Sequence, residues 1–218
     1  MKEFKHLPGL DLIRVFGILV VVFYHYQVET AVRGLCPADF LPAMEPLVQV
    51  AVYTMTLLSG SCLCWQEKSR SWSMKRYLWG RFLAIYPLFW LCFFPIFFYS
   101  DIICGNNEGV APWKLLLSIV GVDGYFQSFT PTFYKIGEWY LGCILFLYAV
   151  FPVLWRMIRR RGVVFAAVGA LFAWLACCFV ENPGQLYPTL IGQLPLFFMG
   201  IFLGGCLPSL WIPVILAG

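Results

Sequence analysis

The first apolar stretch of the chain, "DLIRVFGILVVVFYHYQ" at residues 11–27, carries two ionisable side chains that are able to do chemistry. Arg14 and His25 are separated by ten residues, so on an α-helix they point the same way to within about 20°. The helical rise places them about 16 Å apart along the axis. An imidazole exchanges protons near neutral pH, and a guanidinium binds or stabilises negative charge. One helix face is therefore predicted to carry a general base and a cation at two depths.

A purely structural interpretation fits the same two residues. Arg14 suits an anchor that extends its head group toward the lipid headgroups, and Asp11, three residues earlier, is placed to pair with it. His25 stands between Tyr24 and Tyr26, as an interfacial residue would. Spacing alone leaves both interpretations open, although an ionisable residue inside a span is by default a functional hypothesis.

The elements that must position these residues are membrane-spanning helices. Of the 218 residues, 61% are hydrophobic and only 12% are charged, whereas a soluble domain carries about 25% charged residues. Apolar runs of roughly 20 residues, long enough to cross a bilayer, recur along the chain. We therefore predict an all-α, polytopic transmembrane helical bundle that forms a single membrane-embedded domain over residues 1–218. The expected spans are 9–28, 46–65, 82–100, 136–156, 163–180 and 190–207.

The two ends of the chain add expectations. Asp11 and Arg14 interrupt the first apolar stretch and no convincing small-residue cleavage site follows, so we expect a retained helix rather than a cleaved signal peptide. Residues 208–218, "PSLWIPVILAG", look like the opening of a seventh span and are too short to cross as a helix. A truncated or naturally shortened chain is the expected explanation.

Basic residues predict the orientation. Twelve of the 15 Lys and Arg residues fall on one side of the expected spans and three on the other. Cytoplasmic loops carry the excess of Lys and Arg, so we predict a multi-pass protein of the cell membrane with a cytoplasmic N-terminus. The net charge of +4 therefore indicates topology rather than nucleic-acid binding. In the longest outer connection, 101–135, the stretch "WKLLLSIVGV" predicts an interfacial or re-entrant segment.

The nine cysteines follow no metal-binding pattern, because none has the spacing of a zinc site. Most lie in apolar spans, where a thiol is a small hydrophobic group. No metal site is therefore expected. Cys36 and Cys104 both fall in expected outer connections, and the sequence leaves a disulfide between them open.

Five segments carry a further pattern. "LPGLDLIRVFGILVVVFYHY" opens the first span with Arg, ten residues and His. It is followed by "LLSGSCL" at 57–63, "KRYLWGRFLAIYPLFWL" at 75–91, "EWYLGCILFLYAVFPVL" at 138–154 and "LPLFFMGIFLGG" at 194–205. In this order they resemble the acyltransferase 3 family of integral-membrane O-acyltransferases, which modify surface polysaccharides and other acceptors.

The resemblance has departures as well as matches. The matching positions of the third and fourth segments are Arg81, Ile85, Pro87, Trp139, Leu141, Tyr148 and Pro152. Ala84 stands where the family often has a second Arg, and Arg76 is the nearest substitute. Ile144 stands where one branch has a Glu. The family has more spans than this chain, so its last few are expected to be missing.

The resemblance implies a membrane-bound O-acyltransferase, most simply an acetyltransferase. It would move an acyl group from cytoplasmic acyl-CoA, such as acetyl-CoA, to a hydroxyl of a surface or lipid-linked glycan. It also implies that Arg14 and His25 are essential. No permanently bound cofactor is expected, because acyl-CoA is a donor substrate. The expected partners are membrane lipid, acyl-CoA and the sugar acceptor.

Each remaining candidate residue has two interpretations. Arg76 and Arg81 suit the phosphates of the donor, although the positive-inside rule or anionic lipid explains them equally. Trp139 and Tyr140, at an expected outer helix start, suit stacking on a sugar ring and are also ordinary aromatic-belt residues. Glu138 lies beside them on the acceptor side, although the helix dipole alone favours a carboxylate there.

Two other functions stay open. Polar residues on an inner helix face also suit a transporter of a small molecule or a lipid-linked intermediate. No internal repeat is evident, which counts against many transporter folds. A shortened and inactive homologue of the acyltransferases is the second alternative.

Overall fold

The computed structural model describes residues 8–35, 37–68, 73–106, 109–126, 129–136, 139–161 and 189–206, together with 169, 171, 174, 175 and 178. These residues are helical or irregular and include no β-strand, which confirms the all-α prediction. Four helices are long and apolar enough to cross a membrane: Pro8–Val32, Leu41–Glu67, Met74–Ile103 and Trp139–Arg160. Leu190–Gly205 is a shorter apolar helix.

The chain divides into two compact units. The first combines Met1–Ser71 with Trp155–Gly218, and the second is Trp72–Leu154. The organisation as a single domain stays a prediction.

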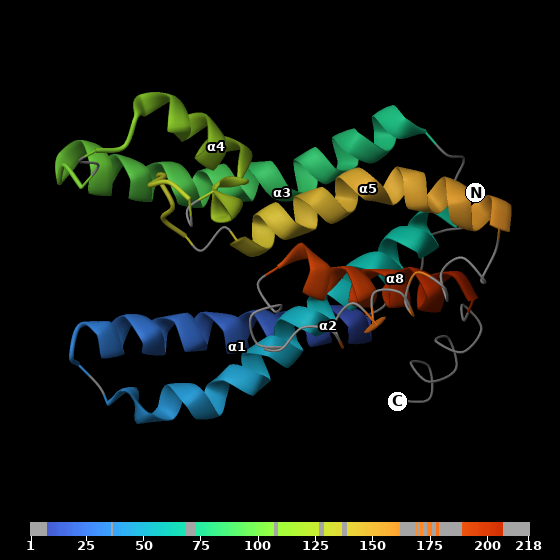
Figure 1. Cartoon of the computed structure of the whole chain (residues 1–218), viewed down its shortest axis with the longest axis horizontal. Helices are drawn as coiled ribbons and strands as arrows, with labels where there is room; N and C mark the ends of the chain where they lie inside the picture. Colours follow the sequence, from blue (N-terminus) through green and yellow to red (C-terminus); the bar gives the residue numbers. More distant parts are fainter. Residues whose placement is uncertain are drawn as a thin grey trace. The chain divides into compact units, whose positions relative to one another are not determined.

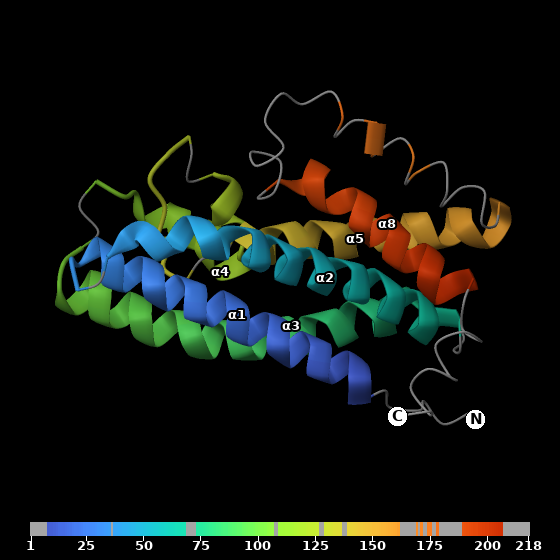
Figure 2. The ribbon, with the colours of Figure 1, turned by 90° about the horizontal axis from the view of Figure 1, so that it is seen from below.

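In the first unit, helix α2 (Leu41–Lys68) lies between α1 (Pro8–Val32) and α8 (Leu190–Cys206) (Figure 1). Helix α1 ends because Gly34 adopts the left-handed conformation, with φ of 69°. The amide of Gly34 then donates to the Ala31 carbonyl and the amide of Leu35 donates to the Thr30 carbonyl, which closes the helix end. A short 3₁₀ turn, Ala38–Phe40, leads into α2, so α1 and α2 form a hairpin (Figure 2).

Helices α2 and α8 touch backbone to backbone, because both carry small residues at the contact. A Cβ atom on Gly200 would lie 2.0 Å from the Leu57 carbonyl oxygen, and one on Gly204 would lie 2.3 Å from that of Ser61. A Cβ atom on Gly60 would lie 2.4 Å from the Phe197 carbonyl oxygen. Only glycine permits this approach, as in small-residue packing of membrane helices. The contact between α1 and α2 is looser, since a Cβ atom on Gly17 would meet nothing closer than 3.7 Å.

The second unit is built on α3 (Met74–Phe97), which continues through a π-helical segment, Phe98–Ile103. The connection to α5 follows, with a 3₁₀ turn at Pro112–Lys114, helix α4 (Leu115–Val120) and a second turn at Asp123–Tyr125. Helix α5 (Trp139–Arg161) returns, and its residues up to Leu154 belong to this unit. Aromatic side chains form the core, where Phe89, Phe93 and Phe133 are buried together.

The stretch 113–122 forms only the six-residue α4, which is held against α3 by two side chains. The Trp90 indole nitrogen donates to the Ile119 carbonyl at 2.9 Å, and the Tyr86 hydroxyl donates to the Val120 carbonyl at 3.0 Å. Gly121, with φ of 78°, then ends the helix. Of the six expected spans, 163–180 lies largely outside the described residues, as does the stretch 208–218. The other five correspond to α1, α2, α3, α5 and α8, with ends that differ by up to eight residues.

Candidate active site

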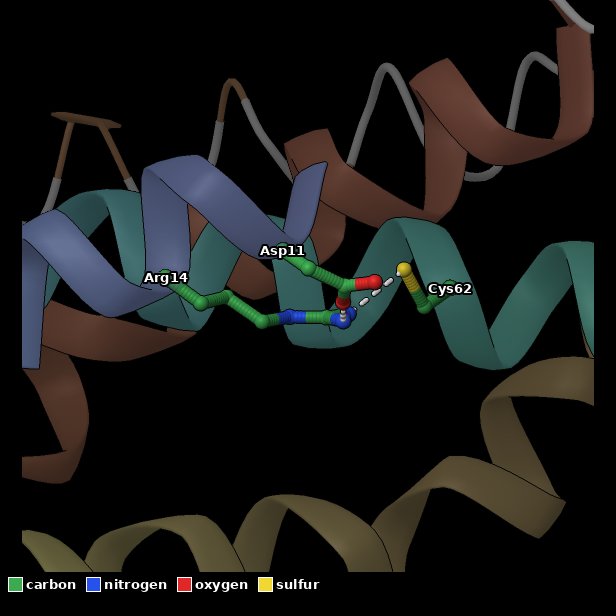
Figure 3. Close-up of polar contacts among 3 residues, drawn as sticks. All are labelled: Asp11, Arg14 and Cys62. Atoms are coloured by element: carbon green, nitrogen blue, oxygen red, sulfur yellow. Dashed lines mark hydrogen bonds and ion pairs between the residues drawn. The ribbon is translucent and has the colours of Figure 1, made fainter. Parts of the chain in front are cut away.

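Arg14 of α1 joins two helices. Its Nη1 atom donates to Asp11 Oδ1 at 2.8 Å, which confirms the predicted pair. Its Nη2 atom donates to the Cys62 Sγ atom of α2, also at 2.8 Å (Figure 3). A helical side chain leans toward the N-terminus of its helix, which explains why Arg14 reaches back to Asp11. The side chains of Arg14 and Asp11 stay 37% and 40% exposed, so the guanidinium is partnered but accessible.

Cys62 is the residue at this site that sequence analysis missed. It lies seven residues after Met55, which packs beneath Gly17 of α1, so both side chains lie on the same side of α2. Cys62 is half-buried. Cys64, two residues on, is rotated by about 200° and is fully buried beside Gly205 of α8. The only signal in the sequence was the lone Cys-x-Cys spacing.

His25 lies farther along α1 and is exposed. Its ring meets the Tyr24 ring edge to face, with centroids 5.9 Å apart. Among the described residues no hydrogen bond or ion pair to the imidazole is present. Arg14 and His25 thus share one side of α1, as predicted, but differ in their surroundings: the guanidinium is packed against α2 and the imidazole is open.

The segment "LLSGSCL" at 57–63 packs α2 against α8. Ser61 Oγ donates to the Gly200 carbonyl at 2.8 Å and lies 3.0 Å from the Leu57 carbonyl. One turn and a half earlier, Thr56 Oγ1 is 2.7 Å from Gln193 Oε1, and both side chains are fully buried. These bonds hold α2 on α8, so the element positions the helix that carries Cys62.

Arg81 of α3 lies over an aromatic ring of α5. Its guanidinium carbon is 5.6 Å from the centroid of the Tyr148 ring, a distance at which a cation is attracted to the ring face. Tyr77, one turn earlier, donates from its hydroxyl to the Tyr148 carbonyl at 2.8 Å and stacks on Phe151. Arg81 is half-buried, whereas Arg76 is exposed. Tyr148, a family match in the sequence, therefore positions Arg81.

Two aromatic side chains begin α5. Trp139 and Tyr140 are half-buried and meet edge to face, with centroids 5.7 Å apart. Glu138, the third residue expected on the acceptor side, lies outside the described residues.

The segment 101–135, which connects α3 to α5, contains buried polar groups that the sequence analysis did not single out. Asp101 and Lys135 form an ion pair at 3.0 Å, with side chains 1% and 17% exposed. The Ser118 hydroxyl donates to Asp123 Oδ2 at 2.6 Å, and both residues are fully buried. Burial raises the pKa of the Asp123 carboxyl, and the Ser118 hydrogen bond opposes that rise. Because a substrate cannot reach these groups in this structure, they hold the connection in place.

The absence of a metal site stays an expectation, and a disulfide between Cys36 and Cys104 stays open. In the described ranges no three His, Cys, Asp or Glu side chains are grouped as a metal ion would require. Cys104 is exposed, and Cys36 lies outside the described residues.

A family model described as an acyltransferase domain matches residues 7–207, which includes all the residues above. No curated protein and no solved structure matches the chain.

Proposed function

The chain belongs to the acyltransferase 3 family of membrane acyltransferases, and on that premise we propose that it is an O-acyltransferase. It transfers an acetyl or similar acyl group from acyl-CoA to a hydroxyl of a surface or lipid-linked glycan. The observation that carries this proposal is the side of α1 that presents Arg14, partnered by Asp11, and the open imidazole of His25.

His25 is the proposed general base. An exposed imidazole is able to receive an acceptor hydroxyl and remove its proton as the oxygen attacks the acyl carbonyl. The same nitrogen is alternatively a nucleophile that carries the acyl group briefly. Both roles require an accessible ring nitrogen, which no other described side chain engages by a hydrogen bond.

Arg14 is the proposed cationic group. Its two terminal nitrogens already donate to Asp11 and Cys62, which fixes the plane of the guanidinium. A fixed and partly exposed guanidinium is suited to orient the donor or to stabilise negative charge on the acyl oxygen. About 16 Å of helix separates it from the level of His25, so the two act on different atoms.

Arg81, with Arg76, is the proposed binding site for donor phosphates. The Tyr148 ring supports one face of the Arg81 guanidinium, and charge-assisted bonds to phosphate are strong. At the other end of the second unit, the Trp139 and Tyr140 rings, with Glu138, are proposed to bind the sugar of the acceptor. Aromatic faces suit the apolar face of a sugar ring.

The proposed orientation places the N-terminus in the cytoplasm of a cell-membrane protein, because Arg159 and Arg160 lie at the end of α5 and basic ends resist translocation. A cysteine introduced at Arg159 should resist an impermeant thiol reagent in intact cells. A cysteine at Arg33, beyond the end of α1, should react. The reverse pattern would contradict the orientation and the donor side with it.

The function is tested with membranes that contain the protein. They are incubated with acetyl-CoA labelled in the acetyl group, and the glycans are then analysed by mass. Labelled O-acetyl groups that depend on His25 are the expected result. Unmodified glycan together with movement of a substrate across the membrane would favour a transporter instead.

A further inference from the structure

Cys62 is the one thiol that contacts the Arg14 cation among the described residues. Its sulfur accepts a hydrogen bond from Nη2 at 2.8 Å while Nη1 is held by Asp11 (Figure 3). The sulfur is half-buried and the guanidinium is more than a third exposed, so the cluster of Asp11, Arg14 and Cys62 is open on one side.

The depth of the cluster also fits a donor that arrives at one membrane face. Arg14 lies about 9 Å from the start of α1 and Cys62 about 9 Å from the end of α2, counted at the rise of a helix. The two helices run in opposite directions, so these distances refer to the same end of the unit. It is the end that the proposed orientation assigns to the cytoplasm.

A cysteine attacks as its thiolate, and a neighbouring arginine stabilises that form. Acyl-CoA is itself a thioester, so exchange of its acyl group onto a cysteine replaces one thioester by another. Building on the proposed function, we propose that Cys62 takes the acyl group from acyl-CoA as a thioester before the acceptor is modified.

The step balances without a further reactant. The Cys62 sulfur forms a bond to the acyl carbonyl carbon, and the bond from that carbon to the CoA sulfur breaks. The proton that leaves Cys62 ends on the CoA thiol. In the second half-reaction the acceptor hydroxyl attacks the same carbon, the bond to Cys62 breaks, and the hydroxyl proton ends on the Cys62 thiol.

The geometry separates these half-reactions. Arg14 contacts Cys62 and belongs to loading, whereas His25, about 16 Å along α1, belongs to deprotonation of the acceptor. Because a general base acts only within hydrogen-bond reach of the attacking hydroxyl, the second half-reaction requires α1 to be displaced along α2 so that His25 approaches the acylated Cys62. Loading is expected to survive the loss of His25, whereas transfer is not.

Cys64 provides the matched control. It shares helix α2 and lies two residues away, but it faces α8, is fully buried, and approaches Gly205. A thiol in that position is a packing group. Replacing it by alanine is expected to leave loading and transfer unchanged.

The test uses membranes containing the full chain, acetyl-CoA labelled in the acetyl group, and no acceptor. Wild type, Cys62→Ala, Cys62→Ser, Cys64→Ala and His25→Phe are compared at equal membrane abundance. We expect label on wild type, Cys64→Ala and His25→Phe that neutral hydroxylamine removes, located at Cys62 by mass spectrometry. Cys62→Ala should carry none, and label on Cys62→Ser should resist hydroxylamine because it would be an oxygen ester. With acceptor present, Cys62→Ala should lose transfer by about 1,000-fold or more, the scale seen when a nucleophile is removed.

The outcomes distinguish failure of the thioester step from failure of the proposed acyltransferase function. Transfer by Cys62→Ala or Cys62→Ser at the wild-type rate overturns the thioester step and leaves the acyltransferase function standing. Label at another residue that persists in Cys62→Ala does the same. If wild type at normal abundance transfers no acetyl group to any glycan, the proposed function fails and the thioester step fails with it.

Discussion

The two units of the chain differ in how their helices pack and in how far their charged residues are buried. In the first unit, helices α2 and α8 meet through Gly60, Gly200 and Gly204, and the ionisable residues of α1 are left partly exposed. In the second unit, aromatic rings fill the core around Phe93, and the ion pair of Asp101 and Lys135 holds the connection 101–135 in place.

The difference separates structural charges from charges that are available to a substrate. Asp101 is almost completely buried and has a lysine partner, so its charge is used within the fold. Arg14 has two partners as well, but more than a third of its side chain stays accessible. Exposure, rather than charge in an apolar segment, therefore distinguishes the residues proposed for catalysis from those that stabilise the fold.

The largest of these effects is expected from a change in the first unit that removes acyl transfer and leaves helix packing intact. His25→Phe should reduce acyl transfer by more than about 100-fold, because phenylalanine cannot accept a proton. Its bulk and apolarity should allow normal insertion at this exposed position. The measurement is transfer at matched membrane abundance, with Tyr26→Phe, an exposed neighbour, as the unaffected control. Full activity of His25→Phe would reduce the imidazole to an interfacial residue.

The next effect is a loss of stability at the contact between α2 and α8 in the first unit. Gly200→Ala would place a methyl group 2.0 Å from a backbone oxygen of α2, which cannot rotate away. We expect a loss of about 3 kcal/mol in the free energy of unfolding, at the upper end of overpacking effects. Thermal unfolding in detergent measures it. Gly80→Ala in α3, where a Cβ atom meets nothing within 4 Å, should have no such effect. Equal stability of the two variants would contradict the backbone contact.

The third prediction tests whether the ion pair of Asp101 and Lys135 contributes more to the free energy of unfolding than an exposed ion pair does. Asp101→Asn should destabilise the chain by about 3 kcal/mol, because it removes the buried carboxylate charge that faces the partly buried Lys135 ammonium. Asp101→Asn combined with Lys135→Met should recover much of that loss. Thermal unfolding of the single and double variants gives the coupling.

The control for this cycle is the exposed pair of Arg33 and Glu29, which are 67% and 59% exposed. Removing either partner should change the free energy of unfolding by less than about 1 kcal/mol. Losses of similar size for both pairs would remove the distinction between the two units.

The fourth prediction tests whether Arg81 of the second unit contributes to binding of the acyl-CoA donor. Arg81→Ala should raise the KM for acyl-CoA about tenfold, equivalent to about 1.4 kcal/mol, if the guanidinium over Tyr148 binds donor phosphates. Initial rates at varied donor concentration measure it, and Lys75→Ala, at the exposed start of α3, is the comparison. An unchanged KM would leave Arg81 with a packing role on Tyr148.

The smallest expected effect concerns Asp123, whose carboxyl has a pKa raised by burial. A raised pKa in the folded state gives a contribution to stability that is complete below the unfolded value of about 3.9 and is lost as the pH rises through the folded value. Asp123→Asn removes this titration. As the pH rises above the unfolded value, the variant should therefore gain stability relative to wild type, by less than about 1 kcal/mol. Parallel pH profiles of unfolding would contradict the buried titration.

Local features of the sequence predicted much of the fold. Runs of apolar residues located five helices, because their length and composition suffice to indicate a span. The pairing of Asp11 with Arg14 followed from a spacing of three residues on one helix, which fixes their proximity. The common side of Arg14 and His25 followed in the same way.

Contacts between distant segments were not predictable from the sequence. Cys62 is 48 residues from Arg14, and only the register of α1 against α2 brings them together. The contact of Arg81 with Tyr148 depends likewise on the register of α3 against α5. Asp101 and Lys135 stand at opposite ends of an irregular connection, for which no periodic pattern exists.

The backbone contact between α2 and α8 also limits how the first unit can move. A slip of one residue would translate α8 by about 1.5 Å and turn it by about 100°, and the side chain of Met199 or Ile201 would then replace Gly200 against the Leu57 carbonyl oxygen of α2. The close backbone contact therefore favours a single register of α8 on α2. Helix α1 meets α2 through ordinary van der Waals contact at Gly17, so packing opposes a change of register less strongly for α1, the helix that carries both Arg14 and His25.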